Sequence, residues 1–129
     1  MNLGDLEKLT PREFHARRAA ERRAAREAVR ERLLAAARAA IRRHAPRFPT
    51  IRAVYLFGSI LRPGWFTHAS DVDVAIEIED IEDEGPFVRA LEQDLRRMVD
   101  LRPLSGAVRD AVATEGEKVY ERRTSDSRP

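Results

Sequence analysis

The segment DVDVAIEIE, residues 71–79, constrains the fold more than any other part of the sequence. Its acidic residues alternate with apolar ones, most regularly around Asp71 and Asp73. Successive side chains of a strand point to opposite faces, so the pattern predicts a strand with one buried and one polar face. The preceding run IRAVYLFG, residues 51–58, is rich in β-forming residues and predicts a second, buried strand.

A long helix is predicted before these strands. Thr10 offers an N-cap hydroxyl and Pro11 suits the first helical position. Ala, Arg, Glu and Leu continue the pattern to about His44, and Pro46 ends it. Apolar residues recur at helical spacing only from Val29 onward, so the second half is expected to pack on the domain. The first half is expected either to project towards a partner or a second copy, or to be a frayed, solvated extension.

The remainder of the chain predicts further short elements. A short helix follows Gly58, a helix covers residues 87–97, and a strand covers residues 98–104. A helix closed by Gly116 and a final strand, EKVYER, follow. The predicted fold is α+β in two layers, a small mixed sheet packed by helices on one side with a long N-terminal Arg/Ala-rich helix.

The chain is expected to form one domain, because 129 residues are enough to bury one hydrophobic core but too few for two domains. We divide it into a charged helical extension (1–28), the domain itself (29–123) and a polar tail (124–129). No apolar run is long enough to span a membrane, and residues 1–14 lack the apolar core of a signal peptide. There is no cysteine, so thiolate chemistry is excluded, and the expected compartment is the cytoplasm.

The charge is distributed unevenly. Residues 12–49 hold twelve Arg and four Glu (12 − 4 = +8), whereas residues 50–100 hold five Arg and eleven acidic residues (5 − 11 = −6). Such a split is typical of a surface for an acidic partner, and equally of a solvated, salt-bridged helix beside an acidic domain. RNA binding is disfavoured, because Glu is interspersed in the basic helix and that helix has no interleaved aromatic residue after Phe14.

Asp71 and Asp73 are the first candidate site residues. Residues i and i+2 of a strand share a face, so the two carboxylates project side by side and repel each other unless a cation lies between them. Mg²⁺ prefers oxygen ligands and is often held by one or two carboxylates together with substrate phosphates. Asp100, inside the predicted strand 98–104, joins them if its strand lies beside theirs in register.

Gly58 and Ser59 suggest how phosphates could be held at the same place. A glycine lets the backbone approach a ligand closely, and the free N–H groups of the short helix SILR favour an anion. Each signal alone is weak, since Gly-Ser is usually a turn and D-x-D usually a solvated strand end. Together they favour phosphoryl or nucleotidyl transfer, which needs positioning and charge neutralisation.

The joint pattern resembles the Gly-Ser…Asp-x-Asp signature of the DNA polymerase β-type nucleotidyltransferase superfamily. In size and in its ending, EGEKVYER, the chain is most similar to the minimal nucleotidyltransferases, over roughly residues 29–122. The resemblance implies that Gly58 and Ser59 bind the triphosphate of ATP or another nucleoside triphosphate. Asp71 and Asp73 would hold two Mg²⁺ ions, and Asp100 would bind the catalytic metal and help to activate the acceptor hydroxyl.

The loop between the two halves of the signature departs from the family. Its eleven residues, 60–70, are one more than usual, and we assign the extra residue to Pro63. Arg62 matches a basic position that could contact phosphate. Trp65 and Phe66 are expected to cover the core rather than to stack on a base, and His68 is expected to have no role.

Minimal nucleotidyltransferases resemble antitoxins that transfer AMP from ATP to a hydroxyl of a HEPN-domain ribonuclease toxin. That resemblance implies Mg²⁺-dependent AMP transfer to a small helical HEPN-type partner protein, with the Arg-rich helix as a candidate docking surface or a contact between copies. Two alternatives remain: a nucleotidyltransferase acting on a small-molecule hydroxyl, and a weakly active or inactive module that neutralises its partner by contact.

Overall fold

The computed structural model describes residues 8–123, and the predicted tail, 124–129, lies outside them. Its central element is a four-stranded sheet in the order β3-β2-β1-β4. The strands are β1 (Ile51–Phe57), β2 (Val72–Ile78), β3 (Val99–Pro103) and β4 (Glu117–Glu121). β1 runs antiparallel to β2 and β4, and β2 runs parallel to β3, so the sheet is mixed as predicted.

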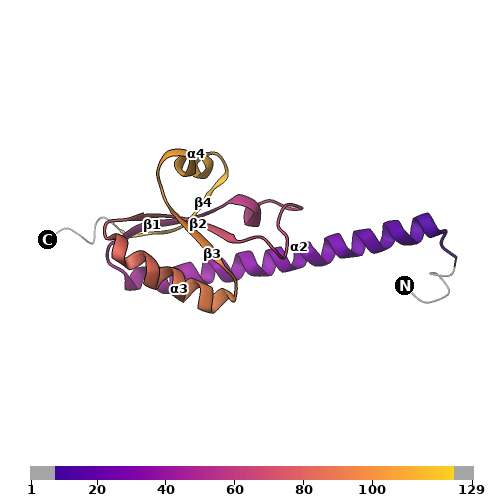
Figure 1. Ribbon diagram of the computed structural model, residues 1–129, viewed down its shortest axis with the longest axis horizontal. Helices are drawn as coiled ribbons and strands as arrows, with labels where there is room; N and C mark the ends of the chain where they lie inside the picture. The colour runs from indigo at the N-terminus through magenta and orange to yellow at the C-terminus, as the bar shows by residue number, and fades with distance from the viewer. Residues whose placement is uncertain (1–7, 124–129) are drawn as a thin grey trace.

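Helix α2 (Pro11–His44) begins and ends as the sequence predicts. The hydroxyl of Thr10 accepts a hydrogen bond from the Glu13 amide at 3.1 Å, and the 3₁₀ turn η1 (Ala45–Arg47) follows the last helical residue. Its C-terminal half packs under the sheet, while its N-terminal half extends beyond the sheet (Figure 1). The first buried residue of the helix is Arg30.

The other helices lie on opposite faces of the sheet. α3 (Glu84–Leu95), which follows the short turn η3 (Ile81–Asp83), packs beside α2 on one face, and α4 (Gly106–Glu115) lies over the other (Figure 1). The α+β class and the packing of α2 and α3 on one side are confirmed, and α4 adds a partial cover on the second face. α4 contains no buried residue, so it is the most lightly packed of these helices.

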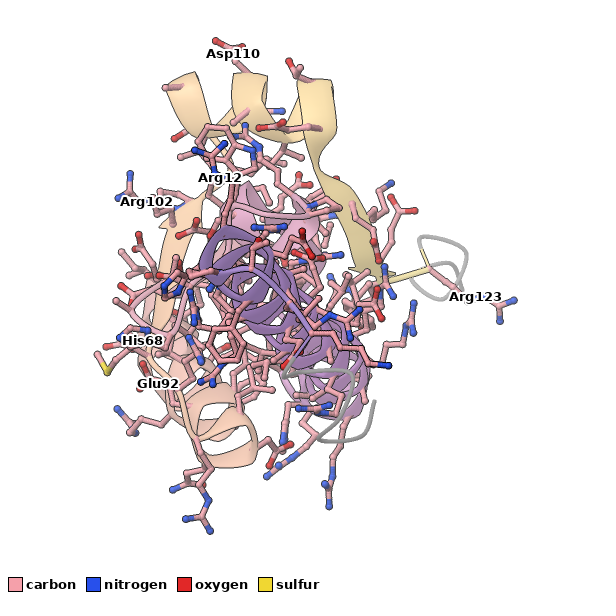
Figure 2. All side chains as sticks on the ribbon, turned by 90° about the vertical axis from the view of Figure 1, so that its right-hand side faces the viewer. Arg12, His68, Glu92, Arg102, Asp110 and Arg123 are labelled. Atoms are coloured by element: carbon pink, nitrogen blue, oxygen red, sulfur yellow. The ribbon has the colours of Figure 1, made fainter. Side chains whose placement is uncertain are left out.

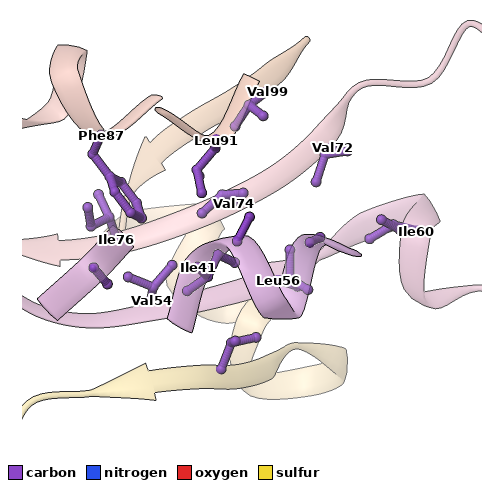
Figure 3. Packing of buried hydrophobic residues seen from close by; sticks show 14 of the residues in the cluster. Ile41, Val54, Leu56, Ile60, Val72, Val74, Ile76, Phe87, Leu91 and Val99 are labelled. Atoms are coloured by element: carbon purple, nitrogen blue, oxygen red, sulfur yellow. The ribbon is translucent and has the colours of Figure 1, made fainter. Parts of the chain in front are cut away.

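The core fills the space between the sheet and the helices α2 and α3 (Figure 3). Val72, Val74 and Ile76 contribute the inward face of β2, as the alternation predicts. Phe87 and Leu91 of α3 close the layer. The polar side chains of β2 therefore lie on the opposite, more open face of the sheet. Within residues 8–123, no helix has the length and the apolarity that crossing a membrane requires.

Candidate active site

The candidate site lies at one end of the sheet, where β1 ends and β2 begins. The 3₁₀ turn η2 (Gly58–Leu61) follows β1 directly, and Phe57 pairs with Asp73 across the antiparallel ladder. Asp73 in turn is the register partner of Asp100 in the parallel pair β2–β3. The register that the sequence analysis required for Asp100 is therefore present.

Gly58 is fitted closely against Asp73. Its φ is +80°, a left-handed conformation that side chains other than glycine rarely adopt, and a Cβ added there would lie 2.2 Å from Asp73 Oδ2. The glycine thus lets the backbone of the Gly-Ser turn approach the carboxylate. Phosphates bound at the turn would lie beside Asp73.

Burial and the neighbouring carboxylates make it costly for Asp73 to ionise. Partial burial, followed by the charge of Asp100 and then of Asp71, raises the pKa of Asp73 above its usual range, and Arg102 opposes this effect. A divalent cation would relieve this repulsion, and an all-carboxylate donor set suits Mg²⁺. The residues present therefore fit such an ion.

The three carboxylates do not form a closed cluster in this conformation. Among the described residues, no group of three His, Cys, Asp or Glu side chains is arranged to hold a metal ion. Asp71 is exposed just before β2, and Asp100 Oδ2 accepts hydrogen bonds from Arg102 Nε at 3.2 Å and pairs with Arg102 Nη2 at 3.1 Å. Figure 2 shows Arg102 beside β3, towards α4. The hydrogen bond to Asp100 also raises the pKa of Arg102.

Arg62 is paired with Glu115 and not with any of the three candidate aspartates. Its guanidinium forms an ion pair with Glu115 at the end of α4 and lies 5.8 Å from the ring centre of Trp65. Its predicted contact with phosphate remains a prediction. The two neighbouring aromatic residues differ in burial. Phe66 is 4% exposed and covers the core as expected, whereas Trp65 is 68% exposed and does not cover it.

Two arginines that the sequence analysis did not single out hold the loops of the site. Arg30 is 7% exposed and donates from Nη1 to the Ile60 carbonyl at 2.8 Å, which fixes the Gly-Ser turn on α2. Arg97 donates from Nη1 to the Ser70 carbonyl at 2.8 Å, just before Asp71. Neither pairing has a local sequence signal. Arg102, in contrast, could have been found, because it shares a strand face with Asp100.

Comparison with known proteins agrees with this geometry. The profile of the family "Polymerase beta, Nucleotidyltransferase" matches residues 40–125, more than half of the chain. The chain therefore belongs to the polymerase β nucleotidyltransferase family and is an enzyme of the nucleotidyltransferase class. A sequence comparison with curated proteins finds no match.

The solved structures that are similar to the chain include the following two. A chain from a toxin–antitoxin structure with AMP-PNP is 26% identical, with a TM-score of 0.50, over 68% of this chain and 73% of the other. A chain from a complex of a tri-AMPylated Shewanella oneidensis HEPN toxin with its MNT antitoxin is 23% identical, with a TM-score of 0.50, over 74% and 77%. At that identity the second likeness concerns the fold alone.

Proposed function

We propose that the protein transfers AMP from ATP to a hydroxyl of a partner protein, in the manner of an antitoxin that modifies a HEPN-type toxin. The observation that carries the proposal is the placement of Asp73 beside both Asp100 and the positive-φ Gly58. The similarity to a toxin–antitoxin structure with AMP-PNP supports the choice of nucleotide and of partner. A reaction that uses ATP on such a partner belongs to the cytoplasm.

The candidate site residues would have separate roles towards ATP and towards the acceptor hydroxyl. The backbone at Gly58 and Ser59 would hold the phosphates, and Arg62 would join them when released from Glu115. Mg²⁺ held by Asp71, Asp73 and Asp100 would neutralise the charge of the reacting phosphates. The acceptor hydroxyl oxygen forms a bond to the α-phosphorus while the bond from that phosphorus to the bridging oxygen breaks. Pyrophosphate leaves, and Asp100 would take the proton of the hydroxyl.

A calorimetric titration of ATP in the presence of Mg²⁺ tests the nucleotide half of the proposal. Wild-type protein should bind, and Asp71→Asn/Asp73→Asn should lose most of the metal-dependent affinity, because both carboxylate charges are gone. If neither protein binds ATP, GTP, CTP or UTP, the chain acts by contact alone.

Labelled ATP tests the acceptor half. With ATP labelled at the α-phosphorus, the partner protein should become labelled and pyrophosphate should be released in equal amount. Label transferred to a small hydroxyl compound, and none to the partner, would support the small-molecule alternative instead.

A further inference from the structure

A hollow of about 330 Å³ lies between α4 and the open face of the sheet. Its size falls in the range of small-molecule sites. It contains none of the residues assigned above to metal or phosphate. Seven described residues line it: Tyr55, Leu104, Arg109, Val112, Ala113, Gly116 and Lys118.

The hollow opens on the same face of the sheet as the carboxylates. Phe57 pairs with Asp73, and Tyr55, two residues earlier in β1, points to the same face as Phe57. The Cα atoms of Asp73 and Tyr55 are separated by about two residues along one strand and one strand spacing, on the order of 8 Å. This separation is comparable to the reach of a nucleoside from its phosphate.

The lining suits an aromatic ligand that carries hydrogen-bond acceptors. Tyr55 lines the hollow together with Val112 and Ala113 of α4, and the Lys118 ammonium lies 5.9 Å from the centre of the Tyr55 ring. Arg109 also lines the hollow and donates from Nη2 to the Leu104 carbonyl at 2.8 Å. The lining residues include no carboxylate, so the hollow does not suit a cationic amine.

The strand order separates the hollow, beside β1 and β4, from the β3 edge of the sheet, where the acceptor hydroxyl would approach. Gly58 follows β1, which lies between β2 and β4, and Tyr55 pairs with Lys118 of β4. Asp100 lies on the edge strand β3, which is on the other side of β2 and Asp73 from β1 and β4. A nucleotide with its phosphates at Gly58 can therefore extend towards β4, and the β3 edge stays open for the acceptor.

Helix α4, which covers the hollow, is joined to the segment that follows the Gly-Ser turn. α4 has no buried residue, and the ion pair between Arg62 and Glu115 ties its C-terminal end to the segment that follows η2. Gly116 lets the chain leave α4 tightly, since a Cβ there would lie 2.7 Å from the Val112 carbonyl oxygen. A lightly packed helix pinned at this end can adjust to a ligand beneath it.

The geometry points to this hollow as the site of the base and ribose of the nucleotide. The Tyr55 ring stacks on the base, and Arg109 and Lys118 donate hydrogen bonds to acceptors of the base or the ribose. The inference rests on the proposed function, because it takes the phosphates to lie at Gly58 and Ser59.

Titration of the full chain with two probes in the presence of Mg²⁺ tests it: ATP and inorganic tripolyphosphate, which lacks the nucleoside. Ala113→Trp fills the hollow and should weaken ATP binding about tenfold or more, the loss expected when a stacked base is displaced. Tripolyphosphate should bind to this variant as it does to wild type. Tyr55→Leu should show the same selective loss.

Ala107→Trp is the matched control, because Ala107 is exposed on the same helix and does not line the hollow. Asp110 on α4 likewise points away from the sheet (Figure 2). The control should leave both affinities unchanged. If Ala113→Trp binds ATP and tripolyphosphate with the same ratio of affinities as wild type, whether or not both affinities fall, the nucleoside site alone is overturned. Two outcomes overturn the proposed function and the nucleoside site with it. In the first, wild type does not bind tripolyphosphate; in the second, Asp71→Asn/Asp73→Asn binds it as tightly as wild type does.

Discussion

At the scale of single residues, Gly58 connects the backbone of the Gly-Ser turn to the position of Asp73. Gly58→Ala places a Cβ only 2.2 Å from Asp73 Oδ2. It also keeps a φ of +80°, which alanine adopts at a cost of about 1 kcal/mol. We expect the carboxylate to be displaced and Mg²⁺-dependent ATP binding to fall about tenfold or more. Calorimetry measures the binding, and urea unfolding measures the stability.

Gly64 provides the control for this substitution. It has a similar φ of +85°, but nothing lies within 4 Å of an added Cβ. Gly64→Ala should therefore lose a similar amount of stability and keep its affinity for ATP. Equal ATP affinities of the two variants would show that the close fit between Gly58 and Asp73 does not matter for binding.

Asp73 should make the stability of the metal-free protein depend on pH. Burial and the charges of Asp100 and Asp71 raise its pKa on folding. A carboxyl with a raised pKa contributes stability that is complete below its unfolded pKa of about 3.9 and is lost as pH rises through the folded value. Asp73→Asn should therefore raise the melting temperature at neutral pH, and this gain should disappear as the pH falls below about 4.

Melting curves with and without Mg²⁺ check this expectation. Added Mg²⁺ should stabilise wild type at neutral pH and have little effect on Asp73→Asn, because the variant offers one carboxylate fewer. A variant that melts below wild type without metal would mean that attraction to Arg102 outweighs burial and repulsion at Asp73.

At the scale of elements, α2 holds the Gly-Ser turn through Arg30. The Ile60 carbonyl accepts a hydrogen bond from Arg30 at 2.8 Å in a buried position. Arg30→Met keeps much of the side-chain bulk but leaves that carbonyl without its partner, so we expect a loss of about 2 kcal/mol in the free energy of unfolding. Arg26→Met, one turn earlier and exposed, should change it by less than about 0.5 kcal/mol in the same urea titration.

The elements that the sequence predicted well are those with local causes. Thr10 and Pro11 determine the start of α2, and the alternation at residues 71–79 determines which face of β2 is buried. Gly116 ends α4 as predicted, but for a different reason. It is extended, with φ −79° and ψ 166°, and glycine is needed because of the close approach to Val112 rather than for a left-handed cap.

The features that the sequence did not predict depend on contacts between distant segments. Arg30 meets Ile60, and Arg97 meets Ser70, across about thirty residues, and no local pattern encodes such pairs. The placement of α4 over the open face was also not predicted, because its weak apolar pattern does not select a face. The register of Asp100 with Asp73 was foreseen only as a condition, since strand order is a property of the whole sheet.

At the scale of the whole molecule, the N-terminal half of α2 extends beyond the folded body (Figure 1). It precedes the residues that the family profile matches, 40–125, and its side chains before Arg30 are exposed or half-buried. Glu27 marks the junction, because its carboxylate accepts hydrogen bonds from Arg30 and from the Gly64 amide. Residues 1–7 of the predicted extension, 1–28, lie outside the described residues. We propose that the described part, residues 8–28, forms an extension whose stability is largely separate from that of the domain.

Paired glycine substitutions in the same helix test this division. Ala24→Gly, in the exposed half, should lower the helical circular-dichroism signal and leave the urea midpoint of the domain unchanged, because the helix can unwind locally from its free end. Ala40→Gly, at a site 3% exposed against the core, adds lost packing to a similar loss of helix propensity of about 1 kcal/mol and should lower the midpoint clearly. Equal shifts of the midpoint would make the whole of α2 one cooperative unit with the domain, and the boundary at residue 28 would then be wrong.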